Sequence, residues 1–121
     1  MKIHAKERLG YDVWAMANLR PKSTGLPNDI VIYVSDEQHS TGPRIKVSNL
    51  RGRPAKKEDK LNNFSVSIED VPKVVAGTPL NFSTKEMEAI SKFIVKNKKC
   101  LLDLWNGDID SVEFALELQK I

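Results

Sequence analysis

Residues 83–105 read STKEMEAISKFIVKNKKCLLDLW and have the spacing of an amphipathic helix. Ser83 and Glu86 are three residues apart, as in a capping box, in which each side chain bonds the backbone N–H of the other residue. One face of the helix collects the large apolar residues, and these are Met87, Ile90, Phe93, Ile94, Leu101, Leu104 and Trp105. Asn97 falls within this face, so either the helix breaks there or the amide is hydrogen-bonded inside. We predict one continuous helix that ends at Gly107.

Upstream of this helix the apolar residues alternate, which is typical of β-strands. Residues 63–69 place Phe64, Val66 and Ile68 inward and Ser65 outward, and residues 44–48 alternate basic with apolar side chains. Residues 30–34 are apolar on both faces, which favours a strand in the middle of a sheet. Residues 13–19 form the first strand, and residues 20–29, with two prolines and a glycine, form a loop.

The remaining elements are short. Residues 70–77 carry a proline near their start and Gly77 at their end, which predicts a helical turn. Asp110 and Glu113 form a second capping box and start a final helix, whose predicted packing residues are Val112, Ala115, Leu116 and Ile109. The predicted fold is therefore α+β, a four- or five-stranded mostly antiparallel sheet with two C-terminal helices packed on one face.

Length and composition predict one cytoplasmic domain over residues 1–121. A chain of 121 residues is too short for two well-buried cores. Residues 1–69 are mainly β, with a mobile basic loop at 50–60, and residues 83–121 are helical. With Cys100 as the one cysteine, no intrachain disulfide can form, which favours a reducing compartment. The apolar runs are too short to cross a membrane and the start lacks a secretory apolar region, so we expect no membrane association.

The charge is unevenly distributed along the chain. Residues 1–60 carry twelve lysines and arginines against seven acidic residues, a net charge of +5, whereas residues 61–121 carry seven against nine, a net charge of −2. This asymmetry indicates an electropositive face on one half of the molecule.

Residues 51–57 read RGRPAKK, and Arg51-Gly52-Arg53-Pro54 resembles the core of an AT-hook. In this motif glycine and proline keep the backbone thin while the arginines enter the minor groove of A·T-rich DNA. The adjacent strand extends the basic segment, and the predicted nucleic-acid-binding residues are Arg44, Lys46, Arg51, Gly52, Arg53, Pro54, Lys56 and Lys57. The alternative is a solvated basic loop that protects a strand edge.

The sequence contains no recognisable catalytic, nucleotide-binding or metal-binding motif, so we predict no cofactor and no metal site. His39 lies in an acidic loop and is interpreted as an exposed histidine. Cys100 is interpreted as a packing residue, unless it is accessible and its pKa is lowered by Lys98 and Lys99.

The segment from Ile30 to His39, the short basic strand after it and the helix ending Leu101-Leu102-Asp103-Leu104-Trp105 resemble a small uncharacterised bacterial domain family. That resemblance implies a gene pair of the toxin–antitoxin kind.

Three functions follow from these features. The first is an accessory protein that binds DNA or RNA through the basic segment. The second is a protein-binding role as inhibitor, antitoxin or oligomeric subunit, favoured by Val95 and Leu102, which lie outside the main apolar face. The third is a small RNase-like enzyme that uses His39 and nearby basic residues.

Overall fold

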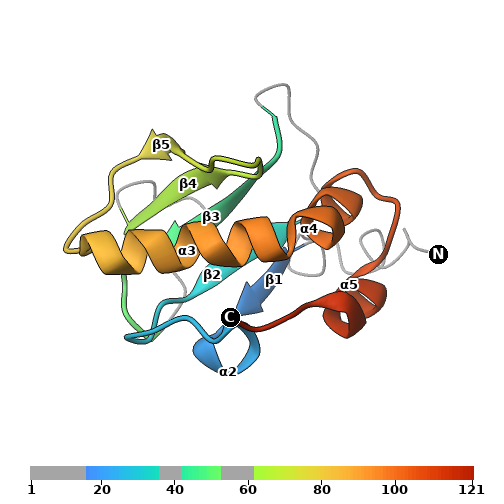
Figure 1. Cartoon of the computed structure of the whole chain (residues 1–121), viewed down its shortest axis with the longest axis horizontal. Coiled ribbons are helices and arrows are strands. Elements are labelled where there is room, and N and C mark those ends of the chain that lie inside the picture. Colours follow the sequence, from blue (N-terminus) through green and yellow to red (C-terminus); the bar gives the residue numbers. More distant parts are fainter. Residues whose placement is uncertain (1–15, 36–41, 53–61) are drawn as a thin grey trace.

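In the described part of the chain, five antiparallel strands form one sheet in the order β1-β2-β3-β4-β5, so strands that follow one another in the chain are also neighbours in space (Figure 1). The strands are β1 (Met16–Leu19), β2 (Ile32–Ser35), β3 (Arg44–Ser48), β4 (Asn63–Ser67) and β5 (Val74–Gly77). The structure is a computed structural model, and it describes residues 16–35, 42–52 and 62–121. The internal position predicted for the segment at 30–34 is confirmed, because β2 pairs with both β1 and β3.

The helices that follow the sheet are α3 (Thr84–Lys96), α4 (Lys98–Trp105) and α5 (Ser111–Glu117). Figure 1 shows α3 running across one face of the sheet. The core between sheet and helices is formed by buried residues of both, among them Ile45, Val47, Phe64, Val66, Ile90, Phe93, Ile94 and Leu101. The α+β fold and the inward positions predicted on β3 and β4 are confirmed.

The opposite face of the sheet is also largely buried. Val31 and Tyr33 have almost no exposed surface, in agreement with the apolar pattern on both faces of this segment. Ser65 lies across from Lys46 on this face and is buried as well. The prediction that Ser65 points into solvent is therefore wrong. The predicted alternation is right, because Ser65 lies on the face of the sheet opposite to Phe64 and Val66.

Residues 74–77 form β5 at the edge of the sheet, not the end of a helical turn as predicted. Phe64 pairs with Gly77 and Val66 with Val74, with a register shift between Ser65 and Val66. Gly77 has φ of 74°, and a Cβ there would lie 2.6 Å from the carbonyl oxygen of Asn63. The glycine at the end of this segment is thus required by close strand pairing rather than by a helix C-terminus.

Asn97 divides the predicted continuous helix into α3 and α4, so the C-terminal region has three helices. Its backbone leaves the helical range, with φ −107° and ψ 16°. Its buried side chain donates to the carbonyls of Phe93 (3.0 Å) and Gln119 (2.9 Å) and accepts from the N–H of Gln119 (2.7 Å). Both alternatives left open by the sequence thus apply together, because the amide that ends α3 also bonds the C-terminal segment.

Both predicted capping boxes are present, at Ser83 and at Asp110. Of the predicted packing residues only Ile109 packs against the core. Phe114 is buried instead, whereas Val112, Ala115 and Leu116 are exposed. Consecutive helical residues are rotated by about 100°, so positions 112 and 116 lie nearly opposite Phe114. The single aromatic residue determines the orientation of this short helix.

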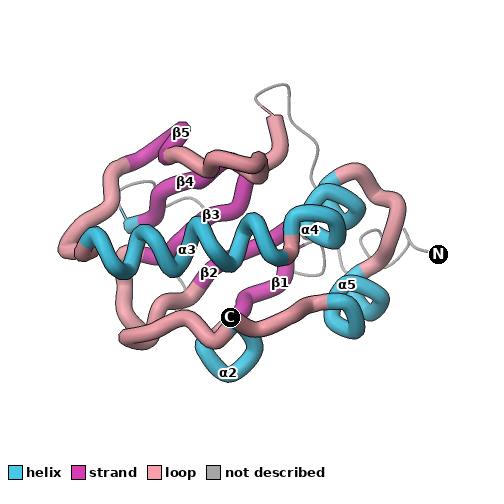
Figure 2. The backbone as a smooth tube through the Cα atoms, in the orientation of Figure 1, coloured by secondary structure: helices cyan, strands magenta, loops and turns pink. Residues whose placement is uncertain are grey.

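The segment predicted as a loop at 20–29 contains a single helical turn, α2 (Pro21–Thr24), which begins with proline and is followed by Gly25. The chain returns to α2 at its C-terminal end, as the tube in Figure 2 shows. There the N–H of Ile121 donates to the carbonyl of Thr24 over 3.0 Å. The last residues therefore lie against the loop that follows β1.

Candidate functional site

The structure describes four of the eight predicted nucleic-acid-binding residues, namely Arg44, Lys46, Arg51 and Gly52; Arg53, Pro54, Lys56 and Lys57 lie outside the described residues. Arg44 and Lys46 are half-buried on β3, and both take part in intramolecular interactions. One of these is a bond from Arg44 Nε to the Gly42 carbonyl over 3.4 Å. They do not form an unengaged basic patch, and nucleic-acid binding by the segment stays a prediction.

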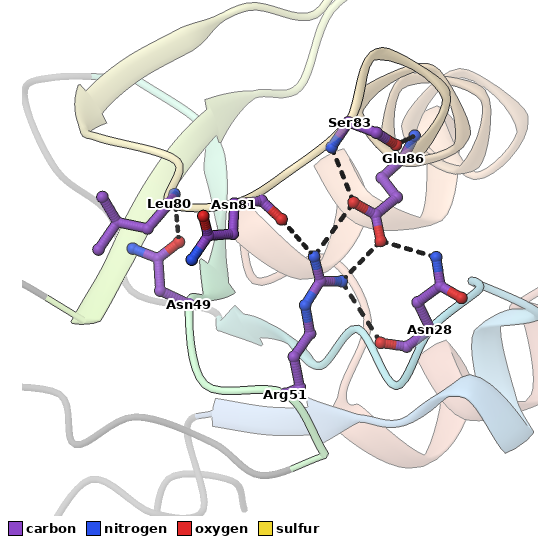
Figure 3. Close-up of polar contacts among 7 residues, drawn as sticks. All are labelled: Asn28, Asn49, Arg51, Leu80, Asn81, Ser83 and Glu86. Carbon is purple, nitrogen blue, oxygen red and sulfur yellow. Dashed lines mark hydrogen bonds and ion pairs between the residues drawn. The ribbon is translucent and has the colours of Figure 1, made fainter.

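Arg51 is held by polar groups from two segments that are distant from it in the chain, at Asn28 and at residues 81–86 (Figure 3). Its guanidinium pairs with both carboxylate oxygens of Glu86, Nη1 to Oε2 at 2.9 Å and Nη2 to Oε1 at 3.1 Å. It also donates to the backbone carbonyls of Asn81 (2.7 Å) and Asn28 (3.3 Å). Such a two-pronged pair is the strong form of an arginine–carboxylate interaction.

Local backbone geometry brings these acceptors together. Asn28 and Asn81 have φ of 55° and 61°, a left-handed conformation that asparagine tolerates better than most residues. Glu86 is the capping-box glutamate of α3, so its carboxylate also accepts from the N–H of Ser83 at 2.8 Å. The amide of Asn28 adds a fourth donor at 2.7 Å. One buried carboxylate thus connects the loop before β2, the loop after β3 and the start of α3.

The electrostatics of the cluster follow from these bonds. Hydrogen bonds from Arg51, the Ser83 N–H and Asn28 lower the pKa of Glu86 from 4.5 to about 2, against the opposing effect of burial. Arg51 also stacks on Phe82, with its guanidinium carbon 4.3 Å from the ring centre, and Phe82 packs edge-on against Phe64. Arg51 is therefore a cross-link within the fold, and the start of the 50–60 loop is anchored rather than free.

Cys100 is a buried packing residue, as the sequence analysis expected. Its thiol points toward the carbonyl of Asn97 (3.4 Å). Burial, together with the charge of Glu117, raises the pKa of the Cys100 thiol. Lys99 instead pairs with Asp103 at 2.8 Å. The condition for a lysine-activated thiol, an accessible Cys100, is therefore not met.

A surface groove runs between β5 and α3. It consists of two adjoining hollows, each with a volume of about 470 Å³, which share Pro72, Ser91 and Lys92. Its lining is largely apolar, and the residues that define this β5–α3 groove are Val71, Pro72, Val74, Met87, Ser91 and Val95. Val71 is 79% exposed and Val95 46% exposed.

Of the groove residues, only Val95 was predicted to contact a partner. Val95 was singled out because it lies outside the main apolar face of the helix, and it is indeed exposed. Leu102, singled out for the same reason, packs against the core of its own chain. Val71, Pro72 and Val74 were missed because residues 70–77 were assigned to a helical turn. The β-branched pair Val74-Val75 was the signal that favoured a strand.

In the described part of the chain, no three histidine, cysteine or acidic side chains are grouped closely enough to hold a metal ion. His39 lies outside the described residues, so its predicted roles are untested. No helix in residues 16–35, 42–52 and 62–121 is long and apolar enough to cross a membrane.

Comparisons with protein-family models, with curated proteins and with solved structures gave no significant match to this chain. The resemblances noted in the sequence therefore stay predictions.

Proposed function

We propose that this protein acts by binding another polypeptide, and that the β5–α3 groove is the binding surface. The observation that carries the proposal is the contiguous apolar lining that Val71, Pro72, Val74 and Val95 leave open to solvent. Contiguous apolar surface rimmed by charged residues is typical of protein–protein contact sites.

The shape of the groove favours a polypeptide over a small molecule. The wall contributed by α3 extends from Thr84 to Lys96, which corresponds to about 18 Å along a helix. Small-molecule sites enclose most of their ligand and aim a few polar groups at it. Here the charged side chains, such as Lys73, Glu88 and Lys92, belong to an open surface.

The partner segment is expected to be helical. Strand addition needs a long and regular free edge, and β5 has four residues, a register shift and a left-handed glycine at its end. Short, irregular edges of this kind oppose strand pairing. An amphipathic helix that lies beside α3 instead covers the exposed valines with its apolar face.

Selection from a displayed library of helical peptides tests this proposal. The full chain serves as bait, and the variants Val95→Glu and Leu80→Glu are compared with it. Val95 and Leu80 are equally exposed, 46% each, but Leu80 does not line the groove. We expect selected peptides to bind Val95→Glu at least tenfold more weakly than wild type, and to bind Leu80→Glu as well as wild type.

Thermal unfolding of both variants controls for folding, because both substitutions are on the surface. The proposal is refuted if no peptide is enriched, or if the enriched peptides bind Val95→Glu and wild type equally well.

A further inference from the structure

The outer face of α5 carries a second exposed apolar surface. Val112 and Leu116 are 67% and 82% exposed, and their spacing of four residues places them one above the other on a helix, about 6 Å apart along its axis. Phe114, on the opposite side, is buried and holds the helix to the molecule. We refer to Val112 and Leu116 as the α5 ridge.

The α5 ridge lies in a strongly acidic segment. Residues 108–117 contain Asp108, Asp110, Glu113 and Glu117 and no lysine or arginine, a formal charge of −4. Asp110 and Glu113 each also accept a backbone N–H in the capping box of α5. These carboxylates are exposed, so negative charge flanks the ridge along α5, while Lys96 and Lys99 line a hollow beside Leu116.

The β5–α3 groove has the opposite charge. Lys73, Lys92 and Lys96 line it together with Asp70 and Glu88. Lys98 binds Asp70 at 2.7 Å. The lining thus holds three lysines and two acidic residues, a formal net charge of +1. Lys73 and Lys92 have no ion pair within the described ranges, so their charges are available to a partner.

We propose that a second copy of this chain occupies the groove, with the α5 ridge of one molecule lying in the β5–α3 groove of the next. The inference rests on the proposed function and names its partner. The two surfaces are complementary in charge, and both present apolar side chains that otherwise face solvent. The seven residues of α5 extend about 10 Å, which fits within the roughly 18 Å of the α3 wall.

The contact joins two different surfaces, so it is head-to-tail. Such contacts generate rings where the rotation closes and open chains where it does not. A symmetric groove-to-groove dimer would instead bring the lysines of one copy against those of the other, which is unfavourable. Because one short helix buries little area, the association is expected to be weak, in the range of roughly 10–100 µM.

Sedimentation velocity on the full chain, up to roughly 500 µM, tests the inference. Wild type is expected to associate with increasing concentration, and less so at high salt, which screens exposed charges. Leu116→Glu removes the ridge and Val95→Glu removes the groove, so each variant alone should stay monomeric. Leu80→Glu should associate like wild type.

Mixing the two monomeric variants gives the sharpest result. Leu116→Glu keeps an intact groove and Val95→Glu keeps an intact ridge, so an equimolar mixture should form 1:1 dimers and nothing larger. A second pair of variants at exposed positions, Val112→Glu on the ridge and Lys92→Glu in the groove, should give the same result. Thermal unfolding of each variant checks that it is folded.

A wild type that stays monomeric over the whole range overturns the inference, as does a mixture of the variants that fails to dimerise. Groove-dependent binding of library peptides by a monomeric wild type overturns self-association and leaves the proposed function standing. If wild type neither self-associates nor binds library peptides, the inference and the proposed function are both overturned.

Discussion

We expect Arg51→Ala to destabilise the protein by about 2–3 kcal/mol, although Arg51 lies at the start of a polar basic loop. The substitution removes both bonds to the Glu86 carboxylate and the bonds to the carbonyls of Asn28 and Asn81. Glu86 remains buried and keeps only the Asn28 amide and the Ser83 N–H as partners.

The magnitude follows from the burial of the two partners. Removing one member of a fully buried ion pair costs about 3–5 kcal/mol. The Arg51 side chain is 32% exposed, so solvent weakens the pair, while loss of the stacking on Phe82 adds roughly 0.5–1 kcal/mol. For a domain of this size, 2–3 kcal/mol corresponds to a decrease in Tm of about 8–12 °C.

Thermal and urea unfolding, followed by circular dichroism, measure this effect. Lys85→Ala is the matched control, because Lys85 is an exposed cation in the first turn of α3, and we expect it to change stability by less than about 0.5 kcal/mol. A loss as small as that for Arg51→Ala would show that the cluster does not hold the fold together. Such a small loss would also mean that Arg51 is available to contact nucleic acid.

Four further results are expected. Because the folded-state pKa of Glu86 is lowered to about 2, its contribution to stability is complete above pH 4.5 and is lost as the pH falls toward 2; unfolding measured between pH 6 and 2 should show a shallower dependence in Arg51→Ala. Asn97→Leu leaves the backbone N–H and carbonyl of Gln119 without their partner, so we expect a loss of about 2–3 kcal/mol and faster hydrogen exchange at the Gln119 amide. Gly77→Ala places a Cβ 2.6 Å from the Asn63 carbonyl oxygen at a left-handed φ; a loss of about 2–3 kcal/mol is expected, and an unchanged Tm would contradict the strand assignment. For the predicted DNA contact, Arg53→Ala should weaken binding to A·T-rich duplexes more than to G·C-rich ones in gel shifts, and absence of wild-type binding at about 50 mM salt would rule the contact out.

Elements whose signals are local could be predicted from the sequence. The capping boxes at Ser83 and Asp110 depend on residues three positions apart, and both are present. The inward residues of β3 and β4 follow from strict alternation, and they are buried. The two apolar faces of the segment at 30–34 placed it inside the sheet. In each case the residues that determine the outcome are close together in the chain.

The candidate binding surface was only partly predictable. The exposure of Val95 was predicted because the apolar residues of α3 recur with the helical period, and Val95 lies outside the face that they form. Val71 and Val74 could not be placed beside it, because their position depends on the pairing of β5 with β4. The exposure of the α5 ridge depends on which side of a two-turn helix is buried, and Phe114 decides this through contacts with the rest of the core.

The sequence by itself determined the strands at β1 to β4, the starts of α3 and α5 and the distribution of charge, because propensity, alternation and capping act over a few residues. Tertiary structure alone decided the role of Arg51, whose partner Glu86 is 35 residues away, and the break at Asn97, whose amide bonds Gln119 from 22 residues away. A polar side chain binds whichever acceptor the fold brings within about 3 Å. The type of a polar residue therefore determines which groups it can bond, whereas the tertiary structure determines which residue becomes its partner.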